Sequence, residues 1–210
     1  MNFLIAGRDT TALGTAWTLY ELLKHPQILS ALREELDAAR REHSHASPPD
    51  AAPDELVSYE TLSQLPFLDA VVHEGLRLHP PIARDIKIAA ADDVLPTGYF
   101  IPKGSWVLYH PYGMGRDVAT WGYDADHFRP ERWLTMQRRP TAYEWPVFNA
   151  GPRVCLGQRM ALLEIKVALV HLLTQLELTP CEGLEGIGYI ESLTKGFDRP
   201  FWVHAERRGE

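Results

Sequence analysis

The residues best suited to chemistry surround one thiol in the segment VFNAGPRVCLGQRMALLEIKV, residues 147–167. Cys155 lies between Gly151 and Gly157, and Arg153 stands two positions before it. A cysteine can bind a metal, act as a nucleophile or pack as a small apolar group. The residues around it distinguish these chemistries.

Three interpretations of Cys155 account poorly for its surroundings. A buried structural thiol would require neither the flanking glycines nor a neighbouring arginine. Zinc requires about four ligands, and no second Cys or His lies at ligand spacing nearby. A nucleophile would require a His/Asp pair, and nothing in the sequence ties one to this segment.

A fourth interpretation, an iron ligand, uses every part of the segment. An apolar helical run follows Cys155, and the start of a helix stabilises a thiolate. Glycines let the backbone approach a flat ligand closely. Arg153 can meet a carboxylate at the edge of that ligand, and Phe148 can cover the sulfur. These parts describe the proximal side of a haem held by cysteine.

The elements that must position this loop are mostly helices. Hydrophobic spacing and proline boundaries predict a flexible loop, rich in Pro, Ala, Ser and Asp, at 43–58. The segment that follows residue 176 is predicted to form loops and a hairpin. The sequence predicts a single, mainly α domain over residues 1–210, with small β-sheets. Its predicted helices cover 3–24, 26–43, 65–79 and 158–176, and its predicted strands 83–90 and 99–110.

Composition excludes several classes of protein. The 210 residues are 45% hydrophobic and 23% charged, as in soluble globular proteins. A net charge of -7, with no cluster of Lys and Arg, argues against a nucleic-acid partner. Two cysteines are too few for a disulfide framework, and with no signal peptide visible we expect reduced thiols. The chain contains no run of about 18 apolar residues, so the sequence predicts no membrane anchor in it.

The cysteine segment resembles the haem-binding signature of the cytochrome P-450 family, Phe-x-x-Gly-x-Arg-x-Cys-x-Gly. The matching positions are Phe148, Gly151, Arg153, Cys155 and Gly157. The resemblance implies haem b, with its iron axially ligated by Cys155. It also implies the C-terminal part of the cytochrome P-450 fold, from the central oxygen-activation helix through the haem-binding loop to a closing hairpin.

A second motif, EGLR, contains Glu74 and Arg77. Their spacing puts them on one helix face, where such pairs are usually solvated and stabilise little. The downstream segment FRPERW changes this expectation. The family resemblance implies that Arg132 joins them in a buried structural cluster, which holds the segment that carries the haem loop.

A third motif, AGRDTT at residues 6–11, resembles the oxygen-activation motif of the family. Polar residues in a helix usually face water, and Gly7 costs about 1 kcal/mol relative to alanine there. The resemblance implies that Ala6 and Gly7 make room for dioxygen. It implies catalytic roles for Thr10, which donates a hydrogen bond where oxygen is activated, and for Asp9, which relays protons.

The segment after EGLRLHPP resembles the turn and strand that pass the haem edge. Ile82 and Ala83 would then face substrate. Arg84 or Lys87 would reach a haem propionate, and the sequence does not choose between them. The alternative is that these are ordinary loop residues.

The segment ESLTKG resembles the hairpin that closes the substrate cavity, which would place Leu193 and Thr194 near substrate, or again in an ordinary loop. The resemblance covers nearly the whole chain but only the C-terminal part of the family. We therefore expect a partial domain without its N-terminal part. Members of full length are expected at the endoplasmic reticulum membrane.

The resemblance implies a monooxygenase that inserts one atom of O2 into a C–H bond of a lipophilic substrate. Electrons would come from NADPH through NADPH–cytochrome P-450 reductase. The three motifs together look most like the fatty-acid ω-hydroxylase branch. The alternatives are a truncated, non-catalytic haem-binding or interaction remnant and, least compatible with the glycines, a structural protein without haem.

Overall fold

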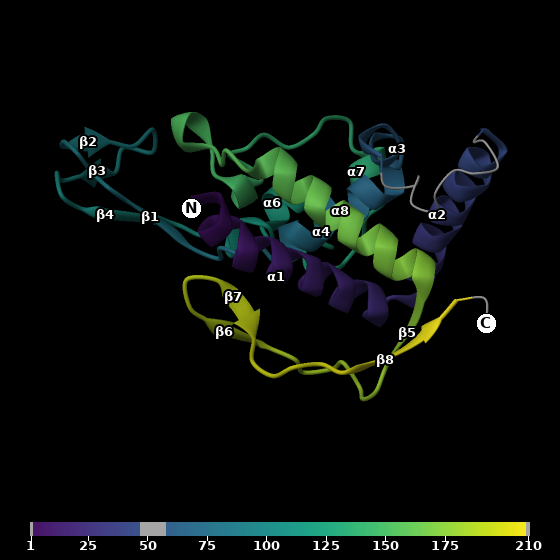
Figure 1. Ribbon diagram of the computed structural model, residues 1–210. Coiled ribbons are helices and arrows are strands. Elements are labelled where there is room, and N and C mark those ends of the chain that lie inside the picture. Colours follow the sequence, from purple (N-terminus) through teal and green to yellow (C-terminus); the bar gives the residue numbers. More distant parts are fainter. Residues whose placement is uncertain (1, 47–57, 209–210) are drawn as a thin grey trace.

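Two long helices, α1 (Asn2–Lys24) and α8 (Gln158–Gln175), pack against each other at the centre of the fold (Figure 1). The computed structural model describes residues 2–46 and 58–208. Trp17 and Leu22 of α1 and Leu169 of α8 are almost wholly buried in the shared core. Burial of these large apolar side chains is the main force that holds the two helices together.

The other helices pack around this pair or lie in the long segment that precedes the cysteine loop. Helix α1 ends before His25–Pro26, as expected because proline disfavours helix in the preceding residue. The remaining helices are α2 (Pro26–Ala46), α3 (Tyr59–Ser63), α4 (Pro66–Leu78), α5 (Pro111–Met114), α6 (Val118–Trp121) and α7 (Arg132–Thr135), with the 3-10 turns η2 (Pro146–Phe148) and η3 (Gly151–Arg153).

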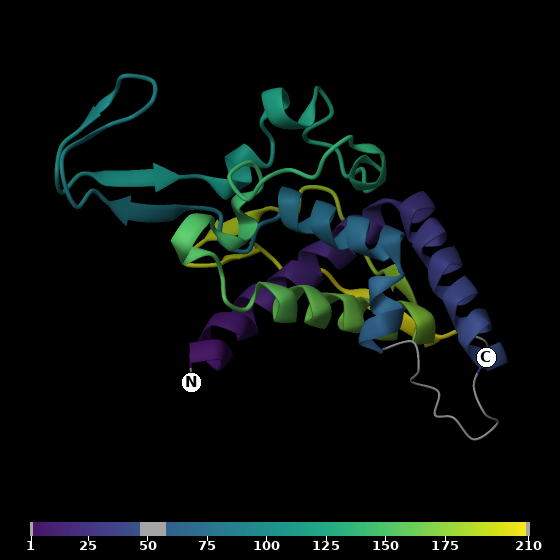
Figure 2. The same cartoon turned by 90° about the horizontal axis from the view of Figure 1, so that it is seen from above.

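The strands of the described residues form four two-stranded antiparallel sheets, β1–β4, β2–β3, β5–β8 and β6–β7. The first two sheets make an arm that projects away from the helices in both views (Figures 1 and 2). The strands are β1 (Asp85–Ile88), β2 (Asp93–Val94), β3 (Phe100–Ile101), β4 (Trp106–Tyr109), β5 (Leu176–Pro180), β6 (Tyr189–Glu191), β7 (Lys195–Phe197) and β8 (Val203–Arg207).

The prediction of a mainly helical fold with small β-sheets is confirmed. The predicted loop at 43–58 begins too early, because α2 continues to Ala46. It also ends too late, because Ser58 caps α3 by accepting a hydrogen bond from the Thr61 amide at 3.1 Å. Residues 47–57 lie outside the described residues. The sequence patterns also missed the pairing of β5 with β8 and the short helices α5 to α7.

Across the part of the chain that the structure describes, no helix combines the length and the apolar character needed to span a bilayer.

Candidate functional site

The cysteine loop presents its thiol at the start of α8. Cys155 follows η3 and lies two residues before Gly157, the N-cap of α8. The Cys155 amide donates to the carbonyl oxygen of Phe148 at 2.8 Å, which closes the loop. The thiol itself is exposed and forms no disulfide. The sulfur thus lies beside the N-terminal, positive end of the α8 dipole.

Glycine is required at one position of this loop and leaves space at another. Gly151 has a φ of +66°, a left-handed conformation that favours glycine. A Cβ added there would also lie 3.2 Å from the Tyr143 hydroxyl oxygen. A Cβ added to Gly157 would lie 3.8 Å from the Cys155 sulfur, so glycine keeps this side of the sulfur open.

Apolar residues stand on both sides of Cys155 in the chain. Val154 and Leu156 flank it in the chain and are 44% and 91% exposed. The ring of Phe148 is half-buried and packs edge-on against Trp145, with 5.8 Å between ring centroids. An unpaired thiol among exposed apolar side chains, with glycine beside the sulfur, fits a flat, largely apolar group bound through sulfur. Among the described residues, no group of three or more His, Cys, Asp or Glu side chains lies close enough together to hold a metal ion.

The AGRDTT segment lies in the first half of α1, which remains helical throughout. The Thr10 hydroxyl donates to the Ala6 carbonyl oxygen at 2.7 Å. Asp9 is exposed and its carboxylate lies 3.7 Å from the Arg8 guanidinium. A Cβ added to Gly7 would meet no atom within 4 Å, so the helix borders open space at this point. Thr10 therefore has a fixed hydrogen bond within its own helix, which the sequence did not predict.

Glu74, Arg77 and Arg132 lie together in the interior, at 0%, 0% and 5% exposure. Two nitrogens of Arg77 donate to the two carboxylate oxygens of Glu74, each at 2.8 Å, and Arg132 Nε donates to Glu74 Oε1 at 2.9 Å. The Trp133 indole donates to Glu74 Oε2 at 2.8 Å, a contact that the sequence analysis missed. The alternative that Glu74 and Arg77 form a solvated surface pair is therefore wrong.

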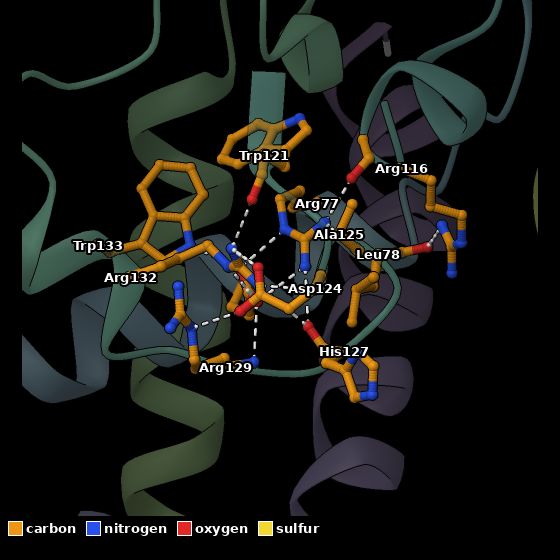
Figure 3. A network of polar contacts seen from close by, with 12 residues as sticks. Arg77, Leu78, Arg116, Trp121, Asp124, Ala125, His127, Arg129, Arg132 and Trp133 are labelled. Carbon is orange, nitrogen blue, oxygen red and sulfur yellow. Dashed lines mark hydrogen bonds and ion pairs between the residues drawn. The ribbon is translucent and has the colours of Figure 1, made fainter. Parts of the chain in front are cut away.

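Most of the other hydrogen bonds of both arginines go to main-chain oxygens of the segment before the cysteine loop, and Arg132 Nη1 also donates to Asp124 Oδ1 at 3.2 Å (Figure 3). Arg77 donates to the carbonyl oxygens of Gly115, Ala125 and His127, the last two at 2.6 and 3.0 Å. Arg132 donates to the carbonyl oxygens of Trp121 and Asp124, each at 3.0 Å. The cluster thus ties helix α4 to the irregular backbone between α5 and α7.

A second polar cluster connects the β1–β4 sheet to the cysteine loop. Tyr109 Oη donates to Asp85 Oδ2 at 2.5 Å and also contacts Asn149 Oδ1 at 2.7 Å, while Asn149 Nδ2 donates to Asp85 at 3.1 Å. Lys87 Nζ donates to Asp85 at 2.8 Å. Burial opposes a charge on Asp85, but the hydrogen bonds from Lys87 and Tyr109 outweigh it and lower the pKa of its carboxyl group. Lys87 is thus engaged by a carboxylate of its own strand, and Arg84 is exposed nearby.

The two segments expected near substrate are joined to each other. Ile82 and Ala83 are half-buried, Leu193 is 86% exposed and Thr194 is half-buried. The amide of Lys195, next to Thr194, donates to the carbonyl oxygen of Pro81 at 2.8 Å.

Comparisons with known proteins agree with the motifs. The family model described as "Cytochrome P450" matches residues 1–187. Cytochrome P450 94A1 of Vicia sativa is 33% identical over 217 residues, 99% of this chain and 40% of the relative. Cytochrome P450 94C1 of Arabidopsis thaliana is 39% identical over 180 residues, 84% of this chain and 35% of the relative. Cytochrome P450 52A12 of Debaryomyces hansenii is 38% identical over 180 residues, covering 82% of this chain and 34% of the relative.

The chain therefore spans at most about 40% of the length of these curated relatives. The match nevertheless extends across most of the chain and includes all three sequence motifs. On this basis, the chain belongs to the cytochrome P450 family.

Proposed function

We propose that this chain forms the haem-binding and oxygen-activating part of a monooxygenase that inserts one oxygen atom of O2 into a C–H bond of a lipophilic substrate. Cytochrome P450 proteins carry a haem whose iron is bound by a cysteine thiolate. The observation that carries the proposal is the exposed, unpaired Cys155 at the start of α8, with the loop closed by its amide and glycine beside its sulfur.

Each residue of the cysteine loop has a role in holding the haem. Cys155 binds the iron, and the start of α8 favours the thiolate form that this bond requires. Arg153 pairs with a propionate, as a guanidinium suits a carboxylate. Phe148 limits water at the sulfur. Lys87 or Arg84 would supply a second positive charge near a propionate.

Asp9 and Thr10 would supply protons where O2 is reduced. When bound, the haem supplies the centre at which O2 is reduced, with electron density donated by the thiolate. Ala6 and Gly7 are small, and the open space beside Gly7 leaves room for dioxygen. The Thr10 hydroxyl, which here donates to the Ala6 carbonyl oxygen, would turn away from that oxygen to donate toward O2, and exposed Asp9 is reached by water.

Fatty acids are the substrate class that we propose, because the three motifs together resemble the ω-hydroxylase branch of the family. Electrons would come from NADPH through NADPH–cytochrome P450 reductase. The full-length protein would act at the endoplasmic reticulum membrane. The exposed apolar tip of the β6–β7 hairpin, at Leu193, suits an aliphatic substrate.

In the full-length protein, Thr10→Ala should lower the rate of product formation by about 10²–10⁴-fold, the usual contribution of a positioned acid–base group. NADPH should still be consumed, and hydrogen peroxide should replace the product, because the side chain of residue 10 can no longer direct protons to the oxygen that is being reduced. Product, NADPH and peroxide are measured together in one assay.

Thr15→Ala is the matched control, because the Thr15 hydroxyl makes the same kind of bond, to the Thr11 carbonyl oxygen at 2.9 Å. It should leave the ratio of product to NADPH unchanged. Equal coupling in the Thr10 variant and the wild type would remove Thr10 from the mechanism. A haem-binding remnant without turnover would instead form no product even in the wild type.

A further inference from the structure

Lys195, at the start of β7, is a buried lysine in a site that the sequence motifs do not explain. Lys195 is 2% exposed, although it lies only two positions after Leu193 at the exposed tip of the hairpin. Its Nζ lies 4.9, 4.1 and 4.2 Å from the ring centroids of Trp17, Tyr112 and Tyr189. Lysine is almost never fully buried unless it has partners.

The lysine belongs to a chain of buried polar groups from three elements. Lys195 Nζ lies 3.3 Å from Nδ1 of His79, the C-cap of α4, and His79 Nε2 lies 2.7 Å from Oε1 of Glu21 in α1. Because Glu21 accepts, His79 Nε2 carries the proton and Nδ1 accepts from Lys195. The imidazole therefore links the hairpin lysine to a carboxylate of the central helix.

The main chain of Lys195 is held on both sides as well. Its amide donates to the Pro81 carbonyl oxygen at 2.8 Å, and its carbonyl oxygen accepts from the Trp17 indole at 2.8 Å. One residue therefore connects the β6–β7 hairpin, the turn that leads to Ile82 and Ala83, and helix α1.

We propose that Lys195 is a positioning residue that docks the β6–β7 hairpin and the 81–83 turn against α1, and that protonation of its amine loosens this docking. The proposal rests on the proposed function in one respect, that these two segments line the substrate site. Lys195 does not contact the reacting atoms.

Burial, together with the nearby charge of Arg116, lowers the pKa of Lys195 to about 7, although the ring faces favour a cation. Burial likewise lowers the pKa of His79 to about 4. Burial opposes a charge on Glu21, but the hydrogen bond and charge of His79 lower the pKa of its carboxyl group. Lys24 and His25 also face the network, beside Glu21.

The sign of the pH effect follows from these shifts. A released hairpin exposes Lys195 to water, where its pKa returns to about 10.4. The released form thus binds more protons than the docked form between about pH 7 and 10, so docking gains stability as the pH rises. His79 and Glu21 titrate below this window.

Hydrogen–deuterium exchange of the full-length haem protein tests the docking directly. After correction for intrinsic exchange rates, peptides covering residues 187–201 should gain about fivefold protection from pH 7 to pH 8. Peptides from α4 provide the internal reference. Lys195→Met should remove this pH dependence, while it keeps an unbranched side chain among the rings of Trp17, Tyr112 and Tyr189. Lys103→Met, at an exposed lysine, is the matched control and should retain it.

An unchanged hairpin protection in the wild type between pH 7 and pH 8 would overturn the proposal, whether or not the Met variant folds. An equal pH response in the wild type and the Lys195 variant would overturn it too. Spectral titration with a fatty acid should show tighter binding at pH 8 than at pH 7 in the wild type and in Lys103→Met, but not in Lys195→Met. The ferrous–CO spectrum is recorded on the same samples, so a failure of haem–thiolate binding is distinguished from a failure of the docking.

Discussion

Cys155→Ser should abolish the red-shifted Soret band that the ferrous–CO complex of the full-length protein owes to thiolate ligation. Serine has nearly the same shape, but its hydroxyl does not ionise at neutral pH and donates far less electron density to iron. The hydrogen bond from the amide of residue 155 to the Phe148 carbonyl oxygen does not involve the side chain, so the loop should keep its conformation. The measurement is the difference spectrum of the reduced protein with and without CO, together with the haem content.

Cys181→Ser provides the matched control, because Cys181 is the other exposed, free thiol of the described residues. It follows β5 and precedes the β6–β7 hairpin, outside the cysteine loop. Its spectrum should equal that of the wild type. A Soret band that persists in the Cys155 variant and disappears in the Cys181 variant would reverse the assignment of the iron ligand.

Glu74→Ala should destabilise the protein by about 3–5 kcal/mol, the usual result of removing one partner from a buried ion pair. Two guanidinium groups would remain in the interior without their carboxylate, and the Trp133 indole would lose its acceptor. Because domains are stable by only about 5–15 kcal/mol, this loss removes a large part of the stability and should lower the folding yield. The denaturant midpoint and the haem retained after purification measure this loss.

Glu144→Ala is the control for Glu74→Ala. Glu144 also makes a two-bond contact with an arginine, Arg138, at 2.6 and 2.8 Å, but this pair lies at the surface. Exposed ion pairs contribute little, so the denaturant midpoint should move far less. If Glu74→Ala folded and held haem normally but lost turnover, its role would be catalytic and our structural assignment would be wrong.

Local sequence rules predicted the elements that local forces determine. Pro26 and Pro80 marked the ends of α1 and α4, and the apolar run after Cys155 predicted α8 closely. The end of α2 was missed, because α2 continues through Ser44, His45 and Ala46, of which Ser and His have only modest helix propensity. The residue types of the cysteine loop pointed to its chemistry because that chemistry depends on neighbours within ten positions.

Contacts between distant segments could not be predicted in the same way. Lys195 lies in a hairpin, where a lysine usually faces water, and its partners His79 and Glu21 are far away in the sequence. Trp133 gave no sign that its indole binds Glu74. The resemblance to a family, and not spacing, supplied Arg132 as the third member of the buried cluster. Tertiary packing decides these contacts, and no local pattern reports it.

The arginine cluster affects how far the sequence of this protein can change while its backbone stays the same. Arg77 and Arg132 hold the segment from Gly115 to Arg132 mainly through carbonyl oxygens, which every residue type provides. Substitutions at exposed positions such as Tyr123, 96% exposed, therefore leave these bonds intact. Gly115 is the exception, since an added Cβ would collide with the carbonyl oxygen of Arg77. Relatives can diverge widely along this stretch and still hold the backbone leading to the thiol on the same path.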